Sequence, residues 1–146
     1  MARKSFTNIF EAVRKGTVED VQYFIEQQCV DVNAKDNSGN TPLHIAVQHW
    51  HGDNEMIEFF ISHRANVLTR NKKRRTARIC AMIKMNTLTA NIADKANLLT
   101  QVVEPGNVES GNAVVTAMSL LTETGEMLQK VKRIMKVIKM LENAEK

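Results

Sequence analysis

The sequence predicts an all-α fold made of repeated pairs of helices, and three observations support this prediction. Ala12, Ala46 and Ala81 lie 34 and 35 residues apart, and the residues around them align with one another. Gly16 and Gly52, each followed by a similar amphipathic run, recur at a spacing of 36 residues. Beyond residue 70, apolar residues return at steps of three and four, as they do along one face of a helix. Periods of this size indicate stacked helix pairs, with one pair in each repeat.

The clearest local signal is the run Asn-Thr-Pro-Leu-His-Ile-Ala-Val at residues 40–47. The hydroxyl of Thr41 can cap the first turn of a helix. Pro42 suits that turn because its missing N–H has no partner there in any case. Gly39, directly upstream, supplies the tight turn that leads into the helix.

This run resembles the signature of the ankyrin repeat, in which an acidic or amide residue and a glycine precede Thr-Pro-Leu-His-x-Ala. Two good copies cover residues 1–68. The resemblance implies pairs of helices joined by β-turn fingers, with His44 bonding Thr41 or the backbone across fingers. It also implies a scaffold that binds another protein without catalysing a reaction.

Later copies diverge from the signature. Arg74 stands where the second copy has Gly39, which leaves open whether the third finger keeps its tight turn. Helical spacing continues to a strong stop at residues 104–106, Glu-Pro-Gly. Further helical runs follow at 113–121 and from 126, and they predict a fourth, diverged pair. We therefore expect one ankyrin-type solenoid of about four helix pairs, with repeats near 1–34, 35–69, 70–106 and 107–146 and a long C-terminal capping helix.

The last segment carries an apolar stripe with two interpretations. Its members step 4-3-4-3 over about four heptads: Ala113, Ala117, Leu120, Thr124, Met127, Val131, Ile134, Ile138 and Leu141. A helix over 112–143 is either continuous or bent near Gly125. The favoured interpretation packs the stripe on the preceding helices, and a homodimeric coiled coil is the alternative. Leu128, Met135 and Met140 widen the stripe, which favours packing within the chain.

The net charge of +4 comes from one stretch. Residues 67–86 hold seven basic side chains and no acidic one: Arg70, Lys72, Lys73, Arg74, Arg75, Arg78 and Lys84. In the ankyrin register the first five fall on the third finger. Such a cluster suits an acidic protein, a nuclear import receptor or nucleic acid, and it could equally be a solvated loop. The absence of interleaved aromatics and of a groove-reading motif argues against nucleic acid.

The resemblance places partner contacts at the finger tips and at the ends of the first helices. In the second repeat these positions are Lys35, Asn37, Ser38, Asn40, Gln48 and His49; in the third they are Arg70, Lys72, Lys73 and Arg75. Trp50 is either a core filler or an exposed anchor of the kind that dominates interface energies.

Other classes of site find no support. Two cysteines without short spacing exclude a disulfide framework and a zinc cluster and favour a reducing compartment. Cys29 and Cys80 are both expected to be small buried hydrophobes in helices. His49 and His51 would point apart on a helix, so no metal site is expected. Without a phosphate loop or a nucleophile constellation, we expect no enzyme activity and no cofactor.

The N-terminus lacks a long apolar run, so no signal peptide is expected, and no stretch is apolar enough to span a membrane. The expected location is intracellular, cytoplasmic or nuclear, or the host cell if the chain is an effector of a pathogen or virus. The expected partner is another protein with an acidic surface. The alternatives are a nuclear or nucleic-acid-associated factor that uses the basic finger at 70–78, or a homodimer formed through the C-terminal helix.

Overall fold

The computed structural model describes residues 5–50, 54–102 and 111–146, and the side chains of residues 5–50, 54–98 and 116–146. Over this part of the chain the fold is all-α, as predicted, with no strand. The six helices are α1 (Ile9–Lys15), α2 (Val18–Glu26), α3 (Pro42–Gln48), α4 (Glu55–Ser62), α5 (Ala77–Val102) and α6 (Gly111–Ala144). None of them is both long and apolar enough to cross a bilayer.

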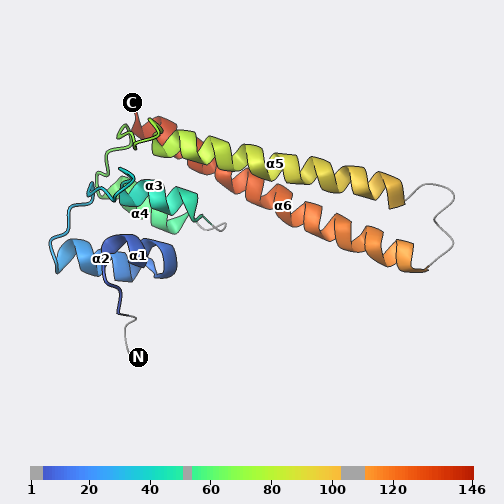
Figure 1. The fold of residues 1–146 in the computed structure, drawn as a ribbon, viewed down its shortest axis with the longest axis horizontal. Coiled ribbons are helices and arrows are strands. Elements are labelled where there is room, and N and C mark those ends of the chain that lie inside the picture. The colour runs from blue at the N-terminus through green and yellow to red at the C-terminus, as the bar shows by residue number, and fades with distance from the viewer. Residues whose placement is uncertain (1–4, 51–53, 103–110) are drawn as a thin grey trace.

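Four short helices form two antiparallel pairs, α1 with α2 and α3 with α4, which stack side by side (Figure 1). α1 packs on α3 and α2 packs on α4, so each repeat covers the apolar side of its neighbour. Ile9 and Ala12 from α1 join Ile57 and Phe60 from α4 in one buried core. This is the packing that the 34-residue period predicts.

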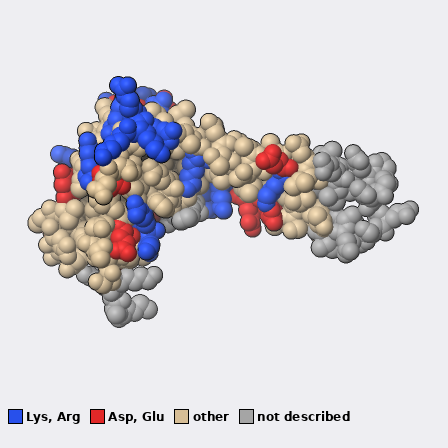
Figure 2. Space-filling model, in the orientation of Figure 1, with Lys and Arg blue, Asp and Glu red and all other residues tan. Residues whose placement is uncertain are grey.

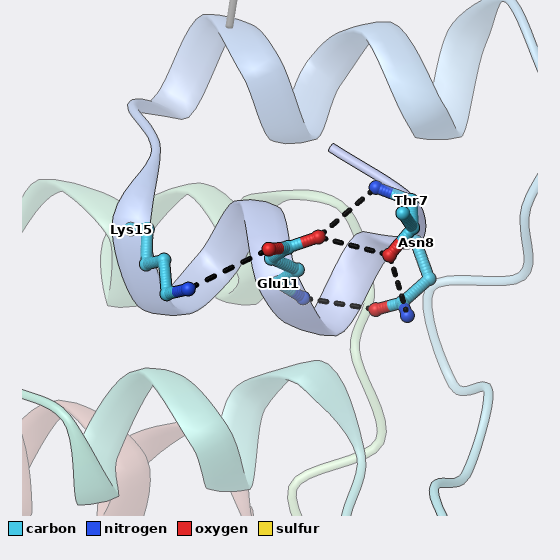
Figure 3. Close-up of polar contacts among 4 residues, drawn as sticks. All are labelled: Thr7, Asn8, Glu11 and Lys15. Atoms are coloured by element: carbon cyan, nitrogen blue, oxygen red, sulfur yellow. Dashed lines mark hydrogen bonds and ion pairs between the residues drawn. The ribbon is translucent and has the colours of Figure 1, made fainter. Parts of the chain in front are cut away.

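A network of polar side chains fixes the start of α1 (Figure 3). Asn8 caps the helix by accepting a hydrogen bond from the backbone N–H of Glu11 at 2.9 Å. The Glu11 carboxylate in turn accepts bonds from the N–H and hydroxyl of Thr7, at 3.1 and 2.9 Å. These bonds, the backbone one first, lower the pKa of Glu11 below its ordinary value, and Lys15 lies 3.6 Å from the same carboxylate. The first repeat therefore begins at a well-defined residue.

α3 begins as the sequence predicts. The hydroxyl of Thr41 accepts a bond from the backbone N–H of His44, while Nδ1 of His44 accepts one from the N–H of Thr41 at 3.2 Å. Pro42 occupies the first helical turn. Every residue of α3 from Pro42 to Val47 is buried, so this short helix is the centre of the core.

The third pair differs from the expected arrangement of about four helix pairs. α5 and α6 form one long antiparallel hairpin that projects beyond the two short pairs (Figure 1), so the described helices make three pairs. α6 is continuous over 34 residues and runs straight through the expected break at 122–125. Thr122 and Thr124 are accommodated in the helix, because their hydroxyls donate to the carbonyl oxygens of Met118 and Leu120, one turn back. The predicted stop at residues 104–106 lies outside the described residues.

Within α6 the predicted stripe packs inside the chain. Val131, Ile134 and Leu141 are buried, and so is Val137, which the stripe did not include. All of these except Val131 belong to the core shared with the repeats. The predicted widening of the stripe is wrong for two residues, because Leu128 and Met135 are about half exposed. Among the described residues, Arg78 of α5 pairs at 2.8 Å with Glu145, directly after the end of α6, and Lys95 of α5 pairs with Glu123 of α6.

Two single-residue expectations are settled by burial. Cys29 is not a buried helical residue: it follows α2, is exposed, and has a φ of +51° that lies outside the helical region. Cys80 is buried in α5, as predicted. Burial raises the pKa of the Cys80 thiol.

Candidate partner-binding surface

The second finger is a tight turn held by one carboxylate. Oδ1 of Asp36 accepts bonds from the backbone N–H groups of Ser38 and Asn40, at 2.8 and 2.9 Å. The N–H of Asp36 donates to the carbonyl oxygen of Asn40 at 2.9 Å, which closes the turn. Gly39 has a φ of +72°, the left-handed conformation that glycine adopts without strain.

The third finger repeats this geometry 35 residues later. Oδ1 of Asn71 accepts from the N–H groups of Lys73 and Arg75, both at 3.0 Å, and the Asn71 N–H donates to the Arg75 carbonyl oxygen at 3.0 Å. Arg74 takes the place of Gly39 with a φ of +59°. The sequence left open whether this finger keeps a tight turn, and the structure shows that it does. The Asn71 amide oxygen accepts the same pair of backbone hydrogen bonds as the Asp36 carboxylate does in the second finger.

Direct hydrogen bonds lock the two fingers together. The N–H of Lys72 donates to the Ser38 carbonyl oxygen at 3.0 Å. Nδ2 of Asn71 donates to Oδ1 of Asn40 at 2.9 Å. Since each bond joins residues more than 30 positions apart, the fingers form one rigid edge rather than two separate loops.

His44 adds a third link between the repeats, as the resemblance implies. Its Nδ1 lies 2.8 Å from the Thr41 hydroxyl, and its Nε2 lies 2.9 Å from the Arg75 carbonyl oxygen. Because Nδ1 accepts from the Thr41 N–H, the network assigns the neutral tautomer that carries its proton on Nε2. Burial lowers the pKa of His44 below its ordinary 6.5, although the bond to Arg75 opposes this shift. The ring is therefore a neutral structural link.

A hollow of about 430 Å³ opens between the fingers, the end of α3 and the start of α5. Seven of the predicted contact residues line it: Asn37, Ser38, Asn40, Gln48, Lys72, Lys73 and Arg75. The predicted set is thus largely brought together. The basic finger and the second finger share one concave surface.

This hollow, which we call the finger hollow, is positively charged. Lys72, Lys73 and Arg75 are exposed at its rim, and none of the described residues that line it is Asp or Glu. Figure 2 shows Lys and Arg side chains gathered at one corner of the molecule, where Figure 1 has the start of α5. Cys80 and Ile83 give the hollow an apolar wall. An anionic group with some apolar surface fits such a lining.

Four predicted contact residues stand apart from the rest. Lys35 and Arg70 are exposed on their fingers but do not line the finger hollow. His49 and Trp50 line a different hollow of about 450 Å³, beside the α1–α2 turn. Trp50 is only 4% exposed and donates from Nε1 to Oδ1 of Asn54 at 3.0 Å. The interpretation of Trp50 as a core residue is therefore right, and its interpretation as an exposed anchor is wrong.

Asn40 also differs from the expectation of an outward contact residue. Its side chain is buried, and its Oδ1 accepts from both Asn71 and Gln48. It therefore braces the wall of the finger hollow rather than reaching outward from it.

Sequence reasoning missed three lining residues, Asn71, Cys80 and Ile83. The 35-residue register could have found one of them, since Ile83 follows the predicted contact residue Gln48 by one period. Lys84, the next residue, donates from Nζ to the Gln48 carbonyl oxygen at 2.8 Å. Burial lowers the pKa of Lys84. This lysine thus ties α5 to the end of α3.

Comparison with protein families finds that the family described as ankyrin repeats, in three copies, matches residues 9–101. A search of curated proteins found no match. Among solved structures, the chain is similar to one in the complex of the predatory endopeptidase Bd0816 from Bdellovibrio bacteriovorus with the immunity protein Bd3460. That similarity has 24% identity and a TM-score of 0.45, and it covers 82% of this chain and 65% of that chain. The chain thus spans just under two thirds of the length of that relative.

Proposed function

Because this chain belongs to the ankyrin repeat family, we propose that it is a non-catalytic scaffold that binds another protein at the finger hollow. The repeats themselves favour protein–protein interaction. The finer assignment, to an acidic partner at this one surface, rests on the lining of the hollow.

The single observation that supports it most is the meeting of three cations at one concave surface. Lys72, Lys73 and Arg75 supply donors for charge-assisted hydrogen bonds, and the part of the lining that the structure describes has no carboxylate to compete for them. A volume of about 430 Å³ accepts a few side chains rather than a whole helix. The ligand that fits is an acidic segment of a protein, with an apolar side chain placed against Cys80 and Ile83.

Rigidity strengthens the proposal. Both fingers are held by the bonds of Asp36 and Asn71 and are joined to each other. A surface that is already ordered loses little conformational entropy when a partner binds. Exposed lysines contribute mainly to the rate of association, and this contribution weakens as salt is added.

The nuclear or nucleic-acid-associated alternative would use the same cations on phosphates. The described lining opposes it, because it includes no aromatic side chain on which a base could stack. The intracellular location, cytoplasmic or nuclear, remains part of our proposal. It rests on two free thiols, Cys29 and Cys80, which suit a reducing compartment.

The test compares two probes on the full chain: a glutamate-rich peptide that contains leucine, and random single- and double-stranded oligonucleotides. Binding is followed by fluorescence anisotropy across a salt series. We expect the peptide to bind, and the double variant Lys72→Glu/Lys73→Glu to weaken it at least tenfold without a change in melting temperature. The matched control is Lys130→Glu/Lys139→Glu on α6, which changes the net charge equally at exposed positions away from the hollow.

Two results would overturn the proposal. One is equal loss of peptide binding in both double variants, since that would reflect net charge alone. The other is tighter binding of oligonucleotides than of peptide at physiological salt, lost in Lys72→Glu/Lys73→Glu and steeply dependent on salt. That pattern would assign the hollow to nucleic acid.

A further inference from the structure

The long hairpin of α5 and α6 leaves much apolar surface uncovered. None of the side chains at residues 82–98 and 116–130 is buried, although these segments include several large apolar residues. Met118, Leu121 and Leu128 are 64%, 56% and 49% exposed. Two helices alone cannot enclose a core, because each covers only one side of the other.

One row of exposed residues with almost no charge runs along each helix. On α5 they are Ile79, Met82, Asn86, Thr89 and Ala93; on α6 they are Met118, Leu121, Gly125, Leu128, Lys132 and Met135. Steps of three and four place each set in one row along its helix. All of these residues are exposed, and Lys132 is the only charged one. We call the two rows together the outer stripe.

The outer stripe faces away from the second repeat. On α5, the opposite side touches α3, because Gln48 bonds both Cys80 and Lys84. On α6, Val137 is fully buried while Met135, two residues away, is 55% exposed. Both rows therefore lie on the end of the stack, where a further repeat would pack.

The two ends of the stack differ in character. A terminal repeat is expected to have a polar outer face. At the N-terminal end this holds, since the exposed residues of α1 and α2 are Arg14, Lys15, Glu19, Tyr23 and Glu26, four of them charged. At the C-terminal end the outer stripe is nearly uncharged. One end of the solenoid is capped, and the other is not.

We propose that the outer stripe is a self-association surface, on which a second copy of this chain stacks through its own α5–α6 hairpin about a two-fold axis. Four helices then share one core, with the small residues Thr89, Ala93 and Gly125 allowing the helices to approach closely. Because the other end is charged, the assembly closes at two copies and does not extend into a filament. The coiled-coil dimer that the sequence left as an alternative would use the buried stripe of α6, whereas this surface lies about a quarter turn around the helix.

The available area is sufficient for such a dimer. The described part of the stripe runs about 25 Å along the helices and is two helices, about 20 Å, wide. The area is then about 500 Å² per copy, or about 1,000 Å² in total, which reaches the lower bound expected of a specific interface. Beyond Met135 the same row of α6 continues with Lys139 and Glu142, which form a polar rim.

The test is the mass of the full chain in solution, measured by sedimentation equilibrium from about 1 to 200 μM, a range chosen to span typical dimer affinities. We expect a concentration-dependent approach to twice the chain mass of 16.5 kDa. Leu128→Glu should raise the dissociation constant at least tenfold. Leu98→Glu is the matched control, because Leu98 is 51% exposed on the same hairpin but lies outside the outer stripe. It should leave association unchanged.

A circular dichroism melt of each variant, taken at low concentration, shows whether the monomer stays folded. A wild-type chain that remains monomeric throughout the range would overturn the proposal. So would equal weakening by Leu98→Glu, or growth into ever larger assemblies. Because Lys72→Glu/Lys73→Glu leaves the outer stripe intact, that variant should still dimerise, which separates this inference from the proposed function of the finger hollow.

Discussion

Nε2 of His44 lies 2.9 Å from the carbonyl oxygen of Arg75, 31 residues further along the chain. The bond runs from the first turn of α3 to the base of the third finger. Through Nδ1, the same ring also accepts from the backbone of Thr41. One neutral imidazole therefore caps its own helix and holds the neighbouring repeat.

This arrangement predicts a pH-dependent stability. Burial lowers the pKa of folded His44 below the 6.5 of an exposed ring, so below that pH the unfolded chain binds more protons than the folded one. The free energy of unfolding should therefore fall as the pH drops from about 7 to 5, by about 1.4 kcal/mol for each unit between the two pKa values. Urea unfolding at several pH values measures this slope. His44→Gln should lower stability at pH 7 and flatten the slope, and parallel curves for the two proteins would contradict the assignment.

The paired positions Gly39 and Arg74 make a second prediction. Arg74→Gly should stabilise the chain by up to about 1 kcal/mol, because a left-handed backbone costs an ordinary residue about 1–2 kcal/mol and glycine very little. Gly39→Ala should destabilise it, since its Cβ would also lie 3.1 Å from the Lys72 nitrogen. Thermal melts of the two variants should shift in opposite directions. Shifts of the same sign would show that the two fingers are not equivalent.

Gly125 offers a third test, inside the longest helix. A Cβ built there meets nothing within 4 Å, and glycine in a helix interior is less favourable than alanine by about 0.5–1 kcal/mol. Gly125→Ala should therefore stabilise the chain by that amount at low protein concentration. Helicity measured by circular dichroism should not decrease. A marked loss of stability would mean that α6 bends at Gly125.

The last prediction concerns the C-terminal half of α6 as part of the core. Ile134 is fully buried, so Ile134→Ala should lower the free energy of unfolding by about 2–4 kcal/mol. Leu98→Ala, at a residue 51% exposed, should change it by less than about 1 kcal/mol. Urea unfolding compares the two. Similar small losses in both would mean that α6 folds independently of the repeats.

How far the sequence could predict the structure depended on how local the signal was. The start of α3 could be predicted from Thr41, Pro42 and His44, because helix capping depends on residues that are neighbours in sequence. The turn at Arg74 could not be predicted from this residue, because the hydrogen bonds of Asn71 impose a left-handed backbone conformation that arginine does not prefer by itself. Cys29 was misplaced because α2 ends three residues before it.

The long hairpin was missed for a related reason. The sequence around Gly125 resembles a turn, because it contains Thr122, Thr124 and a glycine. In the structure the threonine hydroxyls bond one turn back, and the packing of α6 against α5 outweighs the low helix propensity of Gly125. Of the predicted contact residues, those that line the finger hollow follow from the repeat period. The burial of Trp50 depends on tertiary packing, and the sequence had left both outcomes open.

The bond from the Lys72 N–H to the Ser38 carbonyl oxygen has one further consequence. Although residue 72 is exposed, its amide is tied to the other finger and should exchange its hydrogen with solvent only when the two repeats part. Its exchange rate thus gauges the coupling between neighbouring repeats. If that amide exchanges as slowly as the centre of α3, the two repeats open in a single event, and the finger hollow exists either whole or not at all.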